Sequence, residues 1–478
     1  MNGIVKTMDK KAIKTYFNQI SSNRLKWKNK NRYYYQELEK YVKFLIPEKS
    51  TVLEIGCGTG ELLNAVKPSR GVGIDFSQEM IGIAENKFPH LEFRIDDAEE
   101  LKINERFDYV ILSDLIGSLL DVQKAFEQLK KICLPNTRII ITYYNYLWEP
   151  MLKLAEKLKL KMPQPLQNWL SLHDIENLLY LTDFEVIKKG YRLLLPKRIP
   201  LLSGFLNKFI ANIPFFRKLC LTEIVIARPG PCNALYPNVN YTCSVVVCCR
   251  NEKGNIRANI ERIPTLGSHT EIIFVEGHSK DGTLEEIKEQ IKQFPDKDIK
   301  VFVQDGMGKG DALRKGLACA QGDILMVLDA DLTVAPEELL KFYDVLVQGK
   351  GEFIMGSRLV YPIQEEAMRL INLLGNKFFS VAFTYLLEQR IKDTLCANKV
   401  LFKSDYQKIT MNRSFFGDID PFGDFDLIFG AAKINLKILE IPIRYNARTY
   451  GTTQISRFSH GRLLLKMCWI AFRKLKMM

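Results

Sequence analysis

The chain has 478 residues, which is too long for one ordinary core and suits two domains of about 200 to 250 residues. Hydrophobic residues make up 47% of it, and the ten cysteines show no CxxC spacing, so we expect a reduced, cytosolic chain without structural zinc. The net charge of +13 comes with no recognisable nucleic-acid module, which argues against nucleic acid as a partner. The first thirty residues show no secretory signal, and no apolar run approaches the roughly 18 residues of a membrane span.

Strand-like runs alternate with helical periods in the first half, with strands expected at 51–55, 71–75, 109–113 and 138–143. This alternation predicts an α/β domain with a mostly parallel sheet flanked by helices. Three glycines, Gly56, Gly58 and Gly60, follow the first strand and permit a turn whose amides approach a nucleoside cofactor closely.

Two acids follow the next strands. Asp75 ends the second strand, where a carboxylate can accept both hydroxyls of a ribose. The second acid belongs to the run Asp96-Asp97-Ala-Glu-Glu100 after the third strand, where a carboxylate can accept the adenine amino group. A dehydrogenase that binds a dinucleotide is the competing interpretation of the glycines, since the glycine spacing alone is shared with that class.

The run Leu-Glu-Ile-Gly-Cys-Gly-Thr-Gly at 53–60 resembles the glycine motif of the class I S-adenosylmethionine-dependent methyltransferases, and the resemblance covers about residues 30 to 228. It implies a Rossmann-like fold with S-adenosylmethionine as cofactor. Carried over, Glu54 orients the turn, Gly56, Gly58 and Gly60 pass the methionine moiety, Asp75 holds the ribose and Asp97 faces adenine.

Asp114 follows the fourth strand, at the edge that faces the methyl acceptor in that family. It is a candidate catalytic base, and a helix N-cap is the alternative. His173 is a second candidate base, although a single histidine near a helix start is more often structural. The Asn-Pro-Pro-Tyr motif of amino-group methylation is missing, so an oxygen acceptor such as a sugar hydroxyl is expected.

Three prolines and a glycine between Arg228 and Asn240 remove helix and strand options together. We therefore place the joint between two domains here and predict a first domain at 1–229, a linker at 230–240 and a second domain at 241–478. Strands are expected again at 244–249, 271–276, 300–304 and 324–328, which makes the second domain another mostly parallel sheet flanked by helices. Asp329 and Asp331 follow the last of these strands, where paired carboxylates can hold Mg²⁺ or Mn²⁺ and offset charge on a diphosphate.

The motifs around these carboxylates resemble a GT-A glycosyltransferase of the large inverting family that includes dolichyl-phosphate mannose synthase, over about residues 241 to 455. The resemblance implies a nucleotide-diphospho-sugar donor whose site includes Asn251, Glu252, Lys309, Asp329 and Asp331, with the last two also holding the metal. Asp424 is the expected general base, with Asp426 as the alternative, and Arg358 lies on the acceptor side.

Three segments depart from the family pattern or leave roles open. The usual Asp-Asp-Gly-Ser is Glu276-Gly-His-Ser here, which moves the base-contacting carboxylate to Glu276 and leaves uridine or guanosine open. The usual Gly-x-Ser-Lys is Gly451-Thr-Thr-Gln, preceded by Arg444 and Arg448, which could grip a diphosphate or lipid phosphate or be exposed edge-strand charges. In the segment 388–401, Asp393 should stabilise a turn, and Lys392 or Lys399 could meet an anionic acceptor or form a helix-end charge pattern.

Two stretches combine basic and apolar residues without any acid. Residues 186–222 hold eight Lys or Arg among aliphatic and aromatic residues, and the tail at 452–478 repeats the pattern with six. Both suit an anionic membrane surface, and the alternative is that the apolar residues are core and the cations a solvated face.

Together the two halves predict a bifunctional enzyme, cytoplasmic and peripheral on the inner face of a membrane. It would transfer sugar from a nucleotide-diphospho-sugar to polyprenyl phosphate or to a lipid-linked or surface glycan, and methyl from S-adenosylmethionine to an oxygen acceptor. The alternative is a glycosyltransferase whose methyltransferase-like half only binds or docks a partner. The intact cofactor residues argue against such a decayed half.

Overall fold

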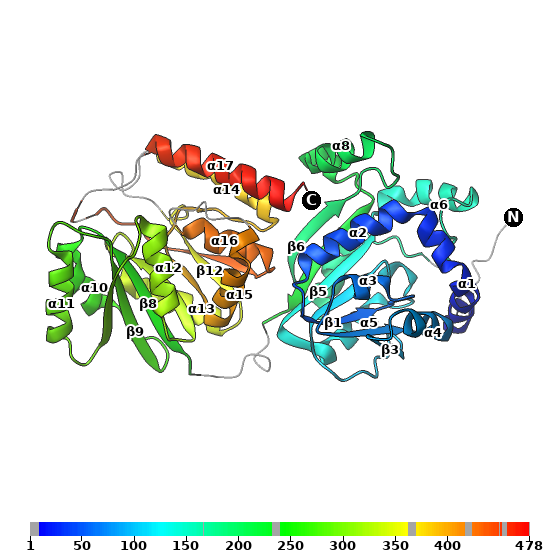
Figure 1. Ribbon diagram of the computed structural model, residues 1–478, viewed down its shortest axis with the longest axis horizontal. Coiled ribbons are helices and arrows are strands. Elements are labelled where there is room, and N and C mark those ends of the chain that lie inside the picture. The colour runs from blue at the N-terminus through cyan, green and yellow to red at the C-terminus, as the bar shows by residue number, and fades with distance from the viewer. Residues whose placement is uncertain are drawn as a thin grey trace. The chain divides into compact units, whose positions relative to one another are not determined.

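A computed structural model describes residues 9–165, 167–231, 240–361, 370–415, 423–448, 450–451 and 457–477. The chain divides into two compact units (Figure 1), one running to Gly230 and the other from Pro231 to Lys476. Each unit contains one sheet of seven strands flanked by helices, which confirms the α/β fold expected of both halves. No helix within the described ranges is both long and apolar enough to cross a membrane.

The sheet of the N-terminal unit has the strand order β3-β2-β1-β4-β5-β7-β6. Neighbouring strands are parallel from β3 to β5, whereas β7 runs antiparallel to both β5 and β6. All four strands expected in this half are present. The strands are β1 Thr51–Ile55, β2 Arg70–Asp75, β3 Glu92–Ile95, β4 Phe107–Ser113, β5 Cys133–Tyr144, β6 Phe184–Arg192 and β7 Thr222–Pro229.

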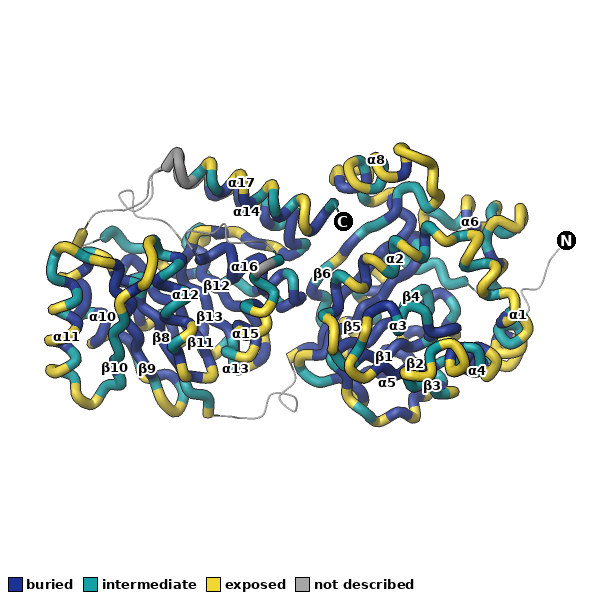
Figure 2. The backbone as a smooth tube through the Cα atoms, viewed as in Figure 1, coloured by how far each residue is buried: buried dark blue, intermediate teal, exposed yellow. Residues whose placement is uncertain are grey.

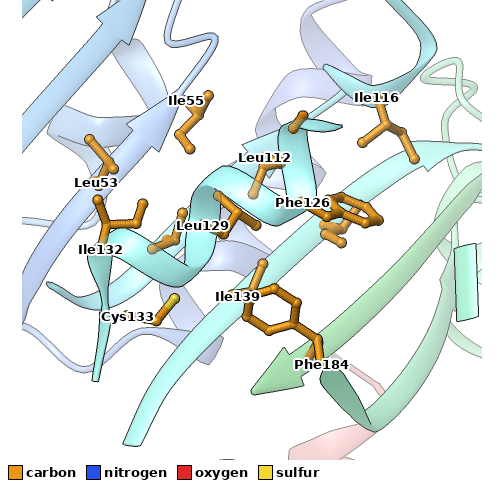
Figure 3. Close-up of a cluster of buried hydrophobic side chains, with 14 of the residues drawn as sticks. Leu53, Ile55, Leu112, Ile116, Phe126, Leu129, Ile132, Cys133, Ile139 and Phe184 are labelled. Atoms are coloured by element: carbon orange, nitrogen blue, oxygen red, sulfur yellow. The ribbon is translucent and has the colours of Figure 1, made fainter. Parts of the chain in front are cut away.

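Two hydrophobic clusters cover the two faces of this sheet. Successive side chains of a strand point to opposite faces, so Leu53 and Ile55 enter one cluster while Val52 enters the other. Figure 3 shows the first cluster, where Phe126 and Leu129 of a helix pack against the strands. The helices of the unit are α1 Lys10–Lys30, α2 Arg32–Leu45, α3 Glu61–Ala65, α4 Gln78–Lys87, α5 Val122–Leu129, α6 Glu149–Lys157, α7 Leu172–Leu181, α8 Leu202–Lys208 and α9 Pro214–Arg217.

The sheet of the C-terminal unit has the order β10-β9-β8-β11-β13-β12-β14, and β13 runs antiparallel to its neighbours β11 and β12. The four expected strands are β8 to β11, which pair in parallel with one another, and β12 pairs with β14 in parallel as well. The strands are β8 Thr242–Cys249, β9 His269–Glu276, β10 Asp298–Val303, β11 Ile324–Asp329, β12 Phe353–Ser357, β13 Lys399–Phe402 and β14 Ile438–Pro442. Its helices are α10 Ile256–Arg262, α11 Thr283–Gln293, α12 Lys309–Cys319, α13 Leu339–Val347, α14 Leu370–Leu387, α15 Lys403–Met411, α16 Asp424–Lys433 and α17 Arg457–Leu475.

Both sheets reverse their winding next to the first strand. Later strands lie on either side of β1 in one sheet and of β8 in the other, and both central strands are buried (Figure 2). In open α/β sheets ligands bind at such a point, outside the carboxyl ends of the strands. The carboxyl ends of β1 and β4, and those of β8 and β11, are therefore where sites are expected.

The two basic stretches fold differently. The first begins as part of β6, with Ile187 and Leu193 buried, and continues through α8 and α9 with many exposed apolar residues. The second forms α17, which packs on α14 and buries Met467 and Ala471 while Trp469 is 55% exposed. Each stretch therefore combines core residues with an exposed apolar face.

Candidate active sites

A cavity that is partly open to solvent lies at the carboxyl ends of the central strands of the N-terminal unit. Its walls come from α1, the glycine turn, the ends of β2 and β4, and the segments on either side of α6. Five residues expected at the first site line it: Gly56, Gly58, Asp75, Asp97 and Asp114.

The glycine turn is built so that only glycine fits. Gly56 has φ +71°, and a Cβ there would lie 2.7 Å from Leu115 Cδ1. Gly58 has φ +54°, and a Cβ there would have a single neighbour within 4 Å, Arg24 Nε, because the space above it is the cavity. The turn therefore brings bare backbone to the cavity wall.

Glu54 and Gly60 support the turn from outside the cavity wall. Glu54 is buried beneath the turn, and its Oε2 accepts a 2.9 Å hydrogen bond from the backbone N–H of Leu63 in α3. Burial raises the pKa of Glu54 to about 8. Gly60 starts α3 with φ +78°. These positions suit the orienting role expected of Glu54 and give neither residue a direct place at a ligand.

The two acids expected to hold the nucleoside sit at the cavity with some of their oxygens already used. Asp75 accepts hydrogen bonds of 2.9 Å from the backbone N–H groups of Gly58 and Ser77. Asp97 pairs with Lys10 of α1 at 2.5 Å. The turn and the end of β2 are thus tied together by Asp75, and α1 closes over Asp97.

Asp114 lies at the cavity and does not cap the helical turn that follows it. Its backbone is left-handed, with φ +52°, and the helical turn that follows has no side-chain cap. Tyr34 donates its hydroxyl to both Asp114 oxygens, at 2.8 and 3.0 Å, and burial raises the pKa of Tyr34, which keeps that hydrogen in place. Burial also raises the pKa of Asp114 to about 6.

His173 does not take part in this site. It is exposed on α7, does not line the cavity, and its Nε2 lies 3.4 Å from the Asn177 amide on the same helix. Its place at the start of α7 fits the structural role that the sequence left as the alternative.

Arg24 is a residue of this cavity that the sequence did not reveal. It reaches the wall from α1, and its Nε is buried with no hydrogen-bond partner among the described residues. Burial opposes the charge of Arg24, but the nearby Tyr35, Tyr144, Asp75 and Asp114 outweigh it and raise its pKa. A buried Nε–H without a partner beside Gly58 suits a carboxylate or phosphate of a ligand.

The second site lies where β8 and β11 end in the C-terminal unit. Lys309, the first residue of α12, places its Nζ 2.6 Å from Asp329 Oδ1 and 4.0 Å from Asp424 Oδ2. Burial alone would raise the pKa of Asp329, but Lys309, Lys399 and Arg358 outweigh it and hold that pKa below its ordinary value. One lysine therefore bridges the carboxylate expected at the donor and the carboxylate expected to act as base.

Asp424 and Asp426 face different partners. Asp424 begins α16 after Gly423 and pairs at 2.7 Å with Lys399, a lysine with no exposed surface. Asp426 pairs at 2.6 Å with Arg413 in the turn after α15. The contacts join Asp424, and not Asp426, to the Lys309–Asp329 pair.

Asp331 and Glu252 share one arginine. The Arg448 guanidinium contacts Asp331 at 2.6 Å and Glu252 at 2.8 Å. Asp331 also accepts hydrogen bonds from the amide and hydroxyl of Thr333. Burial raises the pKa of Glu252. Arg448 thus brings two of the expected donor-site carboxylates together from a distant part of the chain.

Asn251 and Glu276 hold the loops that follow β8 and β9. The side chain of Asn251 accepts a 2.9 Å hydrogen bond from the amide of Lys280. Glu276 is 3% exposed and accepts from the amides of His278 and Ser279. Backbone amides therefore already use the side-chain oxygen of Asn251 and the carboxylate of Glu276. These hydrogen bonds suit Glu276 for shaping its turn rather than for reaching a nucleotide base.

The three arginines expected at the acceptor, Arg358, Arg444 and Arg448, have different partners. Asp393 binds Arg358 through two nitrogens, at 2.7 and 2.8 Å, so this guanidinium locks the segment after β12 instead of facing a phosphate. Burial opposes the charge of Asp393, but Arg358 lowers its pKa to about 2. Arg444 is exposed over the Tyr361 ring, 5.1 Å from its centre, whereas Arg448 is the arginine that contacts Glu252 and Asp331.

The segment 388–401 gives each of its three candidates a defined place. Asp393 accepts the amides of Arg358 and Leu395, so it stabilises a turn as expected. Lys399 is buried against Asp424 and does not meet an acceptor directly, whereas Lys392 is exposed. Thr453 and Gln454, in the place of the usual Gly-x-Ser-Lys, lie outside the described residues.

Neither implied ligand conflicts with these residues. The positive-φ glycine cradle and the unsatisfied Arg24 Nε fit S-adenosylmethionine, whose methionine part carries a carboxylate. In the described part of the chain, no three His, Cys, Asp or Glu side chains form a metal cluster. Mg²⁺ is often held by one or two carboxylates together with substrate phosphates, and Asp329 and Asp331 offer that set.

Comparison with known families agrees with the division into two units. The family model described as Methyltransferase domain matches residues 27–189, and the model described as Glycosyl transferase family 2 matches residues 244–410. The chain joins a methyltransferase domain to a family 2 glycosyl transferase domain. The resemblances stated for both halves are thereby confirmed.

Curated relatives match the glycosyl transferase domain. A dolichol-phosphate mannosyltransferase of Pyrococcus furiosus is 32% identical over 216 residues, 44% of this chain and 58% of that protein. The glycosyltransferase AglJ of Haloferax volcanii is 26% identical over 182 residues, 38% of this chain and 55% of that protein. The chain thus spans little more than half the length of these relatives.

For the methyltransferase domain, a solved structure of magnesium protoporphyrin IX methyltransferase from Synechocystis, with bound S-adenosylhomocysteine, is 18% identical. The match covers 46% of this chain and all of that one, with a TM-score of 0.35.

Proposed function

We propose that the glycosyl transferase domain transfers a sugar from a nucleotide-diphospho-sugar to polyprenyl phosphate or to a lipid-linked or surface glycan. The observation that carries this proposal is Lys309, which lies between Asp329 on the donor side and Asp424 at the position of the base. A single cation in contact with both carboxylates would bring the donor phosphates and the attacking oxygen of the acceptor, a phosphate oxygen of the lipid or a glycan hydroxyl, into one site. The relatives named as dolichol-phosphate sugar transferases support the choice of acceptor.

In this proposal Asp424 takes the proton from the acceptor as the acceptor attacks the sugar from the face opposite the diphosphate. Its pairing with buried Lys399 fixes the carboxylate in place. Lys309 offsets charge on the leaving diphosphate, and Asp329 and Asp331 would hold Mg²⁺ or Mn²⁺. When bound, such an ion supplies further positive charge to that diphosphate.

We propose that the methyltransferase domain methylates an oxygen acceptor, such as a sugar hydroxyl. Gly56, Gly58 and Asp75 line the part of the cavity where S-adenosylmethionine would bind, and Arg24 would pair with its carboxylate. When bound, this cofactor supplies an activated methyl group. Asp114, held by Tyr34, then accepts the proton of the attacking hydroxyl.

A methyltransferase-like half that only docks a partner is the second candidate. The open cavity and the raised pKa of Asp114 favour a working site, since a general base acts best with a pKa near the ambient pH. Calorimetry with S-adenosylmethionine decides between them, because a folded domain that binds no cofactor would be a module.

We propose that the protein works at the cytoplasmic, inner face of a membrane as a peripheral enzyme without nucleic-acid partners. Support comes from the basic amphipathic stretches and from the lipid-phosphate relatives. The deciding experiment is a transfer screen with purified protein, Mg²⁺ or Mn²⁺, and UDP- and GDP-sugars, with or without polyprenyl phosphate. Turnover that needs the lipid supports the proposal, turnover only with a saccharide selects glycan extension, and no turnover with any donor refutes sugar transfer.

A further inference from the structure

Large apolar side chains are exposed on two segments of the methyltransferase domain. In the first, residues 146–160, which include α6, Met151 is 59% exposed and Leu154 is 56% exposed. In the second, residues 199–219, which include α8 and α9, Leu201 is 94%, Phe205 54% and Phe215 72% exposed. Exposed apolar residues gathered in such number mark an interaction site.

The two segments lie side by side. Trp148 donates its Nε1–H to the carbonyl of Leu219 at 2.8 Å, which ties the start of the first segment to the end of the second. At the other end, Asn31 donates to the carbonyl of Leu160 at 3.2 Å and accepts from Lys197 at 2.9 Å. The segments 146–160 and 199–219 thus form one surface, named here the apolar face.

Cations border this face and acids are scarce on it. Residues 186–222 contain no Asp or Glu, and Lys197, Arg198, Lys208 and Lys218 are exposed there. The two acids of the first segment, Glu149 and Glu156, are each paired with a lysine. A second copy of the chain on a two-fold axis would bring these cations together, which opposes self-association. Apolar side chains among exposed surface cations instead match a bilayer that contains anionic lipids.

We infer that the apolar face docks the methyltransferase domain on an anionic membrane surface. The segment with α6 joins two parts of the cavity wall, since Tyr144 precedes it and Gln164 and Gln167 follow it. When α6 binds a bilayer, the methyl-transfer cavity therefore lies next to the membrane surface, and lipid-linked acceptors can reach it. This inference deepens the proposed membrane association, and the docking itself needs neither enzymatic activity.

Hydrogen exchange measured by mass spectrometry on the full chain tests this docking. Vesicles of phosphatidylcholine with phosphatidylglycerol should slow exchange in 146–160 and 199–219 and leave α7 unchanged, whereas pure phosphatidylcholine should give much less protection. Because the readout is local, binding through α17 cannot imitate it. No added protection in these segments, or protection that rises with protein concentration without vesicles, overturns the inference.

A variant with Leu201→Ser, Phe205→Ser and Phe215→Ser keeps the measurement decisive. The three side chains are exposed, so folding should be unaffected, and unchanged exchange of the core strands checks this. The protection that anionic vesicles give to 146–160 should fall at least about tenfold. The matched control changes Tyr180 and Leu181 of α7 to Ser, since they are 79% and 61% exposed outside the face. Undiminished protection in the triple variant overturns the inference, and a failed transfer screen leaves this readout untouched.

Discussion

The buried pair between Lys399 and Asp424 allows a quantitative test of the second site. Lys399 has no exposed surface, and its Nζ donates to Asp424 Oδ1 at 2.7 Å and to the Cys396 carbonyl at 2.6 Å. Removing one partner of such a pair leaves a buried charge and usually costs about 3 to 5 kcal/mol. Lys309, 4.0 Å from the other oxygen of Asp424, offsets part of this loss. We therefore expect Lys399→Met to destabilise the C-terminal unit by about 3 kcal/mol.

The assay is scanning calorimetry of the full chain, in which the two units can give separate transitions. For a unit of this size about 3 kcal/mol corresponds to a transition lowered by about 6 to 12 °C. Asp424→Asn combined with Lys399→Met removes both charges, so the double variant should recover part of the loss. Lys392→Met, at an exposed lysine seven positions earlier, is the control and should change little. A coupling energy below about 0.5 kcal/mol in this cycle would refute the pairing argument.

Four further predictions follow from the two sites. With Asp114 as the base, kcat/KM for methyl transfer should fall about tenfold per pH unit below the Asp114 pKa of about 6. Asp114→Asn should lower the rate about 10²- to 10⁴-fold and abolish this pH dependence. A kcat/KM of the unaltered enzyme that does not change with pH contradicts the assignment. Arg24→Met should weaken S-adenosylmethionine binding at least about tenfold in calorimetry, whereas Lys26→Met, at an exposed position of α1, should not; equal affinities would remove Arg24 from the cofactor site. Asp329→Asn should abolish metal-dependent sugar transfer and leave cofactor binding unchanged, and transfer that survives would show the metal assignment to be wrong. The pKa of Asp393 is lowered from 3.8 to about 2, so its pair with Arg358 stabilises the fold by about 2 kcal/mol above pH 3.8, and this gain is lost as the pH falls through about 2. Asp393→Asn should therefore flatten the curve of unfolding free energy against pH in this range. An unchanged curve refutes the linkage.

The parts of both sites that lie directly after a strand were accessible from the sequence. Gly56, Asp75 and Asp329 follow runs of buried residues, and the ends of parallel strands meet at one edge of a sheet. The fold class follows from the same alternation. The antiparallel strand β13 was not predicted, because it is only four residues long, Lys399–Phe402, and follows a segment whose turn depends on Asp393.

Contacts between distant segments could not be predicted. Arg24 reaches the first cavity from α1 and Tyr34 reaches Asp114 from α2, and no spacing in these helices marks which residues face inward. Arg448 meets Glu252 across 196 positions of sequence, and Arg358 is taken by Asp393 rather than by an acceptor. Such pairings depend on how helices and loops pack on the sheet, which local patterns do not encode.

The cations around Asp329, Asp331 and Asp424 also bear on the order in which ligands arrive. Lys309, Arg448 and Lys399 already contact these three carboxylates at 2.6 to 2.7 Å. A hydrated divalent ion that arrives alone must displace Lys309 or Arg448 without offering the protein a compensating anion. An ion that arrives on the donor diphosphate brings phosphate oxygens to which the displaced lysine or arginine can turn. The glycosyl transferase domain should therefore have little affinity for free metal and should take up metal and nucleotide sugar as one complex.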